Sequence, residues 1–395
     1  MACKNHLLAR VVDSLNERHA RACGPLRREF LSSVAACGMG AILLHPALRA
    51  GPLTVAGKPR LIDFHHHIFP PAFLAVALGN FQKSLALSDW TPQRSLDEMD
   101  SNGVATSIVS LTSPGVWFGN PDAARTLSRK CNDYAAQLVR DYPDRFGFFA
   151  AVPLPDTEGS LREIAYALDV LKADGIGLLT SYGDKWPGDP AYAAVFDELN
   201  RRKALVYFHP TVPNCCKNLI PSIAPPLIEY PHDTTRAVVS LLFSGSFARL
   251  RDIRFIFSHA GGTIPMLAGR IAQLEHPADL NKTAPNGVEY ELKRLHYEIA
   301  NSANRSSISA LTNLVPISQI LFGSDFPFVP TRVTAVGMTH VGLSAAELRA
   351  IGRENAIALL PRLKAQVRSA MPETSESERK TVNRQDETSK LFPAE

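Results

Sequence analysis

The sequence lacks several patterns that mark common classes of protein. Its six cysteines show no CxxC spacing, so we do not expect a structural zinc finger. It has no apolar run of about 18 residues, so a stable membrane span is not expected. The net charge is only +4, and no basic stripe with interleaved aromatic residues is present, which argues against a nucleic-acid partner. What remains is a globular composition, 45% hydrophobic and 20% charged, with enough apolar residues for a sizeable core.

The first 58 residues differ in character from the rest of the chain. Arg27 and Arg28 precede Phe-Leu, a short apolar run over 34–44 and a stretch of small residues. This order is typical of an export signal, and the paired arginines resemble the twin-arginine type. We therefore expect residues 1–58 to be a leader and the protein to be periplasmic. A cytoplasmic location is the alternative, because the arginines begin late and no clean A-x-A cleavage site follows.

Residues 59–362 alternate short apolar runs with helical segments such as 122–141 and 159–173. Eight runs rich in Ile, Val, Leu and Phe are typical of strands buried on both faces. The strand candidates are 60–64, 106–111, 146–151, 175–179, 205–208, 253–257, 296–300 and 320–322. Eight strands separated by helices predict an α/β fold, a (β/α)8 TIM barrel, as one domain.

Two segments are predicted to lack regular structure. Residues 363–395 are polar and charged without an apolar period, so we expect a disordered tail. The proline-rich segment 210–232 is long for a loop between a strand and a helix, and such loops commonly shape a substrate pocket.

The strongest local signal is the run Asp63-Phe64-His65-His66-His67 at the end of the first strand candidate. In a strand, residues i and i+2 point the same way, so His65 and His67 should project together while His66 faces the other side. Two imidazoles on one face can bind a metal, although a hydrogen-bonded pair is the alternative.

Other polar residues also follow strand candidates directly. His209 comes after the fifth, His259 after the sixth and Asp325 after the eighth. Each alone could be a polar loop residue. In a parallel barrel, however, the carboxyl ends of the strands share one face, where active sites form. Together with the histidine pair, they predict a functional site at that face.

These motifs resemble the amidohydrolase superfamily, and within it the branch of aminocarboxymuconate-semialdehyde decarboxylase and related aromatic-acid decarboxylases. The resemblance covers about residues 59–362 and is carried by stretches 62–70, 208–210, 257–262 and 322–327. Stretches 113–119, 209–216 and 233–236 are similar to the 6-methylsalicylate decarboxylase group.

The resemblance implies one metal ion per subunit, Zn²⁺ or alternatively Mn²⁺, held by His65, His67, His209 and Asp325. It implies that His259, with Asp325, is catalytic and moves protons. It also implies that Arg270 reaches a neighbouring subunit's site and binds the substrate carboxylate, which would require a homodimer or a higher homo-oligomer. A surface salt bridge on a helix is the alternative role for Arg270.

The resemblance favours non-oxidative decarboxylation of an ortho-hydroxy aromatic acid such as 6-methylsalicylate, which would give 3-methylphenol and CO2. Hydrolysis or hydration of a lactone, amide or alkene by a metal-activated water is the alternative, because the same residues could serve it. A non-enzymatic binding protein on a degenerate barrel is a third hypothesis, but such a barrel would have lost a metal-ligating residue, and this sequence retains all four. The aromatic residues at 117, 118, 326 and 328 favour a flat aromatic substrate.

Overall fold

The computed structural model describes residues 61–80, 89–274 and 277–364. The predicted leader and nearly all of the predicted tail lie outside these ranges, so export and the domain boundaries stay predictions. No helix in the described ranges is long and apolar enough to cross a membrane.

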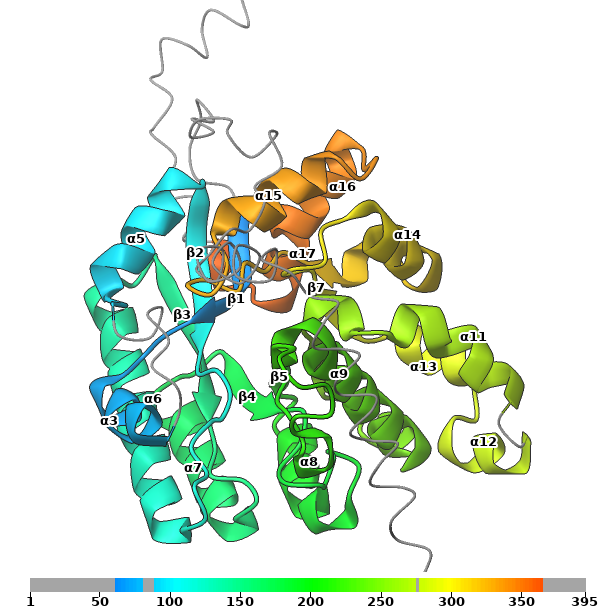
Figure 1. Cartoon of the computed structure of the whole chain (residues 1–395), viewed down its shortest axis with the longest axis horizontal. Helices are drawn as coiled ribbons and strands as arrows, with labels where there is room; N and C mark the ends of the chain where they lie inside the picture. The colour runs from blue at the N-terminus through cyan, green and yellow to red at the C-terminus, as the bar shows by residue number, and fades with distance from the viewer. Residues whose placement is uncertain (1–60, 81–88, 275–276, 365–395) are drawn as a thin grey trace, which may run out of the picture. The chain divides into compact units, whose positions relative to one another are not determined.

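Eight parallel strands form a ring in chain order, each paired with the next (Figure 1). They are β1 Leu61–His67, β2 Val104–Ser110, β3 Phe146–Ala151, β4 Gly175–Leu179, β5 Leu205–His209, β6 Arg254–Phe257, β7 His296–Glu298 and β8 Ile320–Leu321. The chain after β8 lies beside β1: the amide of Phe64 donates to the carbonyl of Phe322 at 3.0 Å, and that of His67 to Phe326 at 2.9 Å. These bonds close the ring, and the predicted (β/α)8 barrel is confirmed.

Helices surround the strands (Figure 1). The longer ones are α3 Pro71–Asn80, α5 Pro92–Ser101, α6 Pro121–Asp141, α7 Thr157–Asp169, α8 Ala193–Arg201, α9 Pro225–Phe243, α11 Ile264–Leu274, α14 Arg305–Leu314 and α15 Thr331–Thr339. The shorter ones are α10 Ser246–Arg249, α12 Pro277–Thr283, α13 Val288–Lys293, α16 Ala345–Arg349 and α17 Asn355–Leu359. Single turns occupy η2 Pro190–Tyr192, η3 Asn214–Cys216, η4 His259–Gly261, η5 Ile317–Gln319 and η6 Ala350–Glu354.

Capping side chains explain where several helices begin. Asn120, Asp156 and Asn304 precede α6, α7 and α14, and each side chain accepts a hydrogen bond from a backbone amide of the first turn. The segment 210–232 is not a loop throughout, because α9 begins within it at Pro225. Prolines at the first positions of a helix fit there, since those backbone amides have no partner within the helix.

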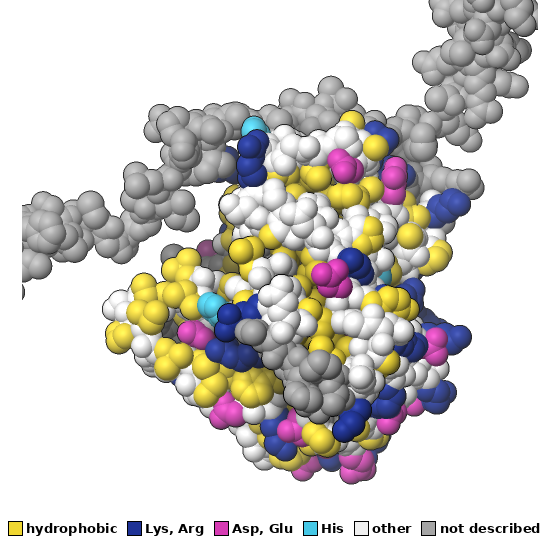
Figure 2. All heavy atoms as spheres, turned by 90° about the vertical axis from the view of Figure 1, so that its right-hand side faces the viewer, with side chains coloured by type: hydrophobic (Ala, Val, Ile, Leu, Met, Phe, Trp, Pro, Cys, Tyr) yellow, Lys and Arg dark blue, Asp and Glu magenta, His cyan; other side chains and the backbone are white. Residues whose placement is uncertain are grey.

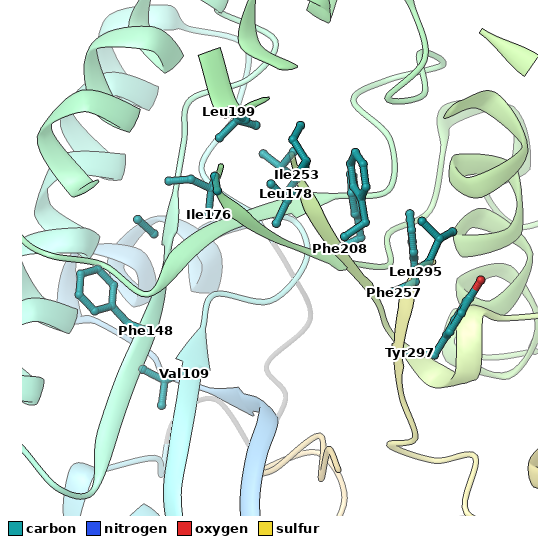
Figure 3. Packing of buried hydrophobic residues seen from close by; sticks show 14 of the residues in the cluster. Val109, Phe148, Ile176, Leu178, Leu199, Phe208, Ile253, Phe257, Leu295 and Tyr297 are labelled. Atoms are coloured by element: carbon teal, nitrogen blue, oxygen red, sulfur yellow. The ribbon is translucent and has the colours of Figure 1, made fainter. Parts of the chain in front are cut away.

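The strands are buried on both faces, which gives the fold two apolar layers. Along β5, Val206 and Phe208 pack outward among the helices, whereas Leu205 and Tyr207 pack inside the barrel. Figure 3 shows part of the outer layer, including Phe208. His209, the next residue in the inner row, therefore points into the barrel at the carboxyl end of the strand.

Candidate metal centre and active site

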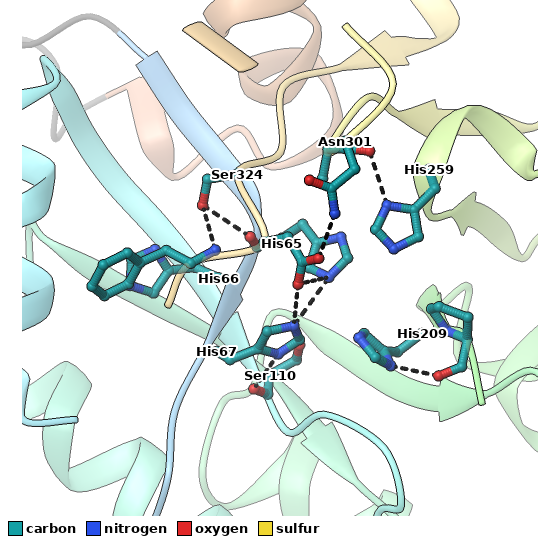
Figure 4. A network of polar contacts seen from close by, with 12 residues as sticks. His65, His66, His67, Ser110, His209, His259, Asn301 and Ser324 are labelled. Carbon is teal, nitrogen blue, oxygen red and sulfur yellow. Dashed lines mark hydrogen bonds and ion pairs between the residues drawn. The ribbon is translucent and has the colours of Figure 1, made fainter. Parts of the chain in front are cut away.

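The four predicted ligands meet at the carboxyl end of the barrel. His65 and His67 come from β1, His209 ends β5, and Asp325 follows β8. One nitrogen or oxygen atom from each lies within 4.8 Å of those from the other three, and all four residues are buried. Figure 4 shows the imidazoles of the three histidines turned toward one point. The structure therefore brings together residues separated by up to 260 positions.

The distances between these atoms suit a shared cation. Nε2 of His65 lies 3.1 Å from Nε2 of His67, and Oδ1 of Asp325 lies 3.2 Å and 3.1 Å from those two nitrogens. Ligands at about 2.1 Å from one ion and about 90–100° apart lie about 3 Å from one another. The three atoms thus fit adjacent ligand positions around one ion.

The second nitrogen of each histidine ring already has a partner. Nδ1 of His65 lies 2.7 Å from Oε1 of Glu298. Nδ1 of His67 lies 3.3 Å from the carbonyl oxygen of Ser110, and Nδ1 of His209 lies 2.8 Å from that of Pro210. Because these oxygens only accept, each Nδ1 carries a proton, and each Nε2 can give a lone pair to a metal in place of a second proton. Three lone pairs and a carboxylate that face one another repel unless a cation lies between them. The residues present therefore fit a divalent metal.

The electrostatics of the cluster support the same conclusion. Burial lowers the pKa of His209 well below its usual value, and the neighbouring imidazoles lower it further. Burial alone would raise the pKa of Asp325, but the His65 imidazole and hydrogen bonds from His65 and His67 hold it well below its usual range. Burial lowers the pKa of His65, yet Glu298 and Asp325 raise it to about 10. The two carboxylates thus give this site a strong affinity for positive charge.

His66 points away from the cluster, as its place in the strand predicts (Figure 4). Its Nε2 lies 2.9 Å from Oγ of Ser95, and its Nδ1 lies 3.2 Å from Oδ2 of Asp63. Asp63 also accepts from the amides of His65 and Ser324 through Oδ1, at 2.9 and 3.0 Å. The strand register shifts between Asp63 and His66, so Asp63 supports an irregular stretch of β1 that aims the two ligands.

His259 lies beside the cluster and outside the ligand group. It follows β6, its ring centroid is 4.9 Å from that of His65, and its Nδ1 donates to the carbonyl of Ala300 at 2.9 Å. Nε2 is therefore the ring nitrogen left to exchange a proton. Asn301, next to Ala300, donates from Nδ2 to Oδ2 of Asp325 at 2.7 Å.

The backbone at the site is held in an uncommon conformation. His259, Asn301 and Asp325 have φ angles of 53°, 55° and 68°, in the left-handed region that few residues other than glycine adopt. Such strain clusters at functional sites, where the surrounding structure holds it in place.

A cavity of about 900 Å³ opens over these residues. His209, His259 and Asp325 form its polar end, and Phe73, Tyr230 and Phe328 are its aromatic residues. No lysine or arginine is among the described residues that line it. The aromatic residues expected at the pocket are only partly found: Phe328 lines the cavity, Phe326 is buried against His66, and Trp117 and Phe118 are not among the lining residues.

Arg270 lies away from the cavity of its own subunit. It is exposed on α11 and makes no ion pair within the described residues, so the surface salt bridge considered for it is not found there. Figure 2 shows the side of the molecule that carries α11 to α14, where hydrophobic and charged side chains are mixed. The role of Arg270 at a neighbouring subunit's site stays a prediction.

Two residues of the site were not predicted from the sequence. Glu298 at the end of β7 is fully buried and contacts His65 and His259, and Asn301 holds Asp325. The signal for Glu298 was present, since a carboxylate stands alone in the apolar run 296–300. Its two oxygens already accept N–H donors, so the group His65, His259 and Glu298 is better described as a hydrogen-bonded set than as a second metal site.

Comparisons with known proteins identify relatives that match most of the described chain. The family model described as Amidohydrolase matches residues 62–362. The chain is 38% identical over 323 residues to decarboxylase yanB of Aspergillus niger, covering 76% of this chain and 87% of that protein. It is also 38% identical over 327 residues to the 6-methylsalicylic acid decarboxylase acuB of Aspergillus aculeatus, covering 79% and 99%. A solved structure of an amidohydrolase II is 28% identical, with a TM-score of 0.71 over 76% of this chain and 99% of that one.

Proposed function

The chain belongs to the amidohydrolase family, and we propose that it is a metal-dependent, non-oxidative decarboxylase of an ortho-hydroxy aromatic acid such as 6-methylsalicylate. The products would be 3-methylphenol and CO2. The observation that carries this proposal is a His3Asp ligand set beside His259, at the floor of a cavity without cationic side chains among its described lining. The similarity to a 6-methylsalicylic acid decarboxylase supports the substrate class.

His65, His67, His209 and Asp325 would hold one ion per subunit, Zn²⁺ or Mn²⁺, since three imidazoles and one carboxylate suit either. When bound, the ion supplies a Lewis acid that attracts the carboxylate and phenolate oxygens of the substrate. The described lining has no lysine or arginine, so this subunit offers the substrate carboxylate no ammonium or guanidinium group there.

His259 is the residue best placed to move the proton. Imidazole gives and takes protons near neutral pH, and Nδ1 of His259 is occupied by Ala300, which leaves Nε2 for the substrate. A proton delivered from Nε2 to the ring carbon that bears the carboxylate would interrupt the aromatic system. Loss of CO2 from that carbon then restores it. Asp325, the other residue expected to move protons, would be a deprotonated carboxylate when it binds the ion, which leaves His259 as the proton donor.

The apolar lining suits the rest of an aromatic acid. Phe73, Tyr230 and Phe328 line the cavity, and aromatic side chains pack favourably against a flat ring. We further propose, from the family resemblance, that Arg270 of a neighbouring subunit meets the substrate carboxylate in a homodimer or a higher oligomer.

The test is to purify the chain, measure its metal content and incubate it with 6-methylsalicylate, salicylate, other hydroxybenzoates and a panel of lactones. We expect CO2 and the matching phenol from at least one hydroxybenzoate, and none from the Asp325→Ala variant, which should also lose its metal. Lactone opening without CO2 release would show that the enzyme is a hydrolase instead.

A further inference from the structure

Glu298 is a buried carboxylate that takes no direct part in the chemistry proposed above. It ends β7 and has no exposed surface. Three N–H groups converge on it: Oε1 accepts from Nδ1 of His65 at 2.7 Å and from the amide of His259 at 2.8 Å, and Oε2 accepts from the amide of Ala300 at 2.6 Å. One side chain therefore contacts a predicted metal ligand and the backbone of the predicted proton donor.

The chain after β8 passes very close to this carboxylate. A Cβ atom at Gly323 would lie 2.1 Å from Oε2 of Glu298, so only glycine allows the two segments to approach this closely. The three N–H groups lie 2.6–2.8 Å from its oxygens, and a carboxylate that accepts several hydrogen bonds holds each donor more firmly than a neutral acceptor would.

The bond to His65 decides which nitrogen of that ring is free. With Nδ1–H bound to Glu298, the ring cannot flip, and Nε2 is the atom that faces His67 and Asp325. A carboxylate behind a ligand histidine also makes its other nitrogen a stronger electron donor.

The hydrogen bonds that Glu298 accepts from the amides of His259 and Ala300 hold the imidazole of His259 in place. The amide of His259 is held by Glu298 while the residue has a φ of 53°. The carbonyl of Ala300 then accepts from Nδ1 of the same imidazole, and the amide of Ala300 is itself held by Glu298. The ring of His259 is thus fixed at both its backbone and its Nδ1 atom.

We propose that Glu298 is a positioning residue that aims Nε2 of His65 at the metal and Nε2 of His259 at the substrate. The part that concerns His259 rests on the proposed decarboxylase function, whereas the part that concerns His65 rests only on metal binding. One carboxylate would therefore hold both a residue that binds the ion and the residue that moves the proton.

The experiment compares Glu298→Gln with Glu291→Gln. Glu291 on α13 is a matched control, because it is also fully buried but is paired with Arg251 and Arg294, outside the site. The dissociation constants for Zn²⁺ and Mn²⁺ are measured by competition with a chelator. We expect Glu298→Gln to weaken metal binding about 10-fold to 100-fold, as loss of such a hydrogen-bond partner typically does. Glu291→Gln should lower thermal stability and leave the metal constant within about twofold.

Unchanged metal affinity in Glu298→Gln would overturn the proposal for His65. If that variant does not fold, Glu298→Asp is the alternative test, because it keeps a carboxylate but shortens its reach to His65. Glu298→Asp should weaken metal binding, and wild-type affinity in that variant would contradict the proposal. At saturating metal, we expect Glu298→Gln to lower kcat with little change in KM. If no hydroxybenzoate is decarboxylated by the wild type, the proposed function fails, while the metal constants still test the role of Glu298.

Discussion

The side-chain amide of Asn301 donates to Oδ2 of Asp325 at 2.7 Å, while Oδ1 of the same carboxylate faces His65 and His67. The two oxygens of Asp325 thus have separate partners, and Asn301 sets the angle of the carboxylate. Asn301 also has a left-handed backbone, a conformation that asparagine and glycine tolerate best.

Asn301→Gly should therefore remove the hydrogen bond without adding backbone strain. We expect kcat/KM to fall about 10-fold to 100-fold, since a hydrogen bond to a charged group contributes about 1.5–3 kcal/mol. The control is Asn120→Gly, which alters the cap of α6 and is not among the residues that line the cavity, so kcat/KM should be unchanged. Equal activity of Asn301→Gly and wild type would show that Asp325 needs no support.

Replacing His259 separates proton transfer from metal binding. His259→Asn keeps a residue that tolerates a positive φ but removes the imidazole. We expect full metal content by elemental analysis, with turnover about 100-fold to 10,000-fold lower, the usual contribution of a general acid. His340→Asn, at an exposed histidine that follows α15, should leave both unchanged. Loss of metal in His259→Asn would mean that this histidine is a ligand.

Gly323→Ala tests the close approach between the chain after β8 and Glu298. The added methyl would overlap Oε2 of Glu298 and come within 2.9 Å of Cβ of His65. We expect a loss of about 1–3 kcal/mol in the free energy of unfolding, as for other overpacked cores, together with weaker metal binding. Gly269→Ala in α11, where no atom lies within 4 Å of the added methyl, should be neutral or stabilising. Similar thermal midpoints for the two variants would contradict this account.

The stability of the fold should depend on pH through His296, at the start of β7. Burial lowers its pKa to about 4, with a further contribution from Arg254, whereas in the unfolded chain the imidazole keeps its usual pKa of 6.5. Between pH 4 and pH 6.5 the His296 imidazole binds a proton in the unfolded chain but not in the folded one. The free energy of unfolding therefore falls as the pH drops below 6.5, and His296 causes no further loss below pH 4.

Each pKa unit corresponds to about 1.4 kcal/mol, so His296 should cost the protein about 2 kcal/mol between pH 7 and pH 5. Denaturant unfolding of wild type and His296→Asn at the two pH values measures this directly. The variant should lose less stability than wild type over that range. An identical loss in both proteins would assign the pH dependence to other groups.

The barrel was predictable because its strands are buried on both faces and so appear as short apolar runs. Strands β3 and β4 match the predicted residues, and each apolar run begins directly after a charged residue, Arg145 or Asp174. Strand β7 ends two residues before the predicted limit, because after Glu298 the chain turns to bring Ala300 and Asn301 to the site. The start of α9 was hidden by its prolines, which read as loop residues when the capping position is unknown.

The candidate site was only half predictable for a related reason. His65, His67, His209 and Asp325 follow apolar strands directly, so the parallel topology alone gathers them. Glu298 matters through a hydrogen bond to a residue 233 positions away, and periodicity carries no information about such contacts. The same holds for the left-handed backbone of Asn301, which only the folded loops impose.

The pairing of β1 with the chain after β8 has a consequence for how the protein matures. His65 enters the site from the first strand, and Asp325 from the segment that closes the ring at the last one, where its amide donates to the carbonyl of His65 at 2.7 Å. A nascent chain that has not yet reached Asp325 has the histidines but lacks the carboxylate.

An ion that requires all four donors binds only the closed ring and so favours closure. At a free concentration 1,000 times its dissociation constant, such a ligand adds about 4 kcal/mol to the stability of the form that binds it. Metal supply would then set both the activity of each molecule and the fraction of newly made chains that survive to become enzyme.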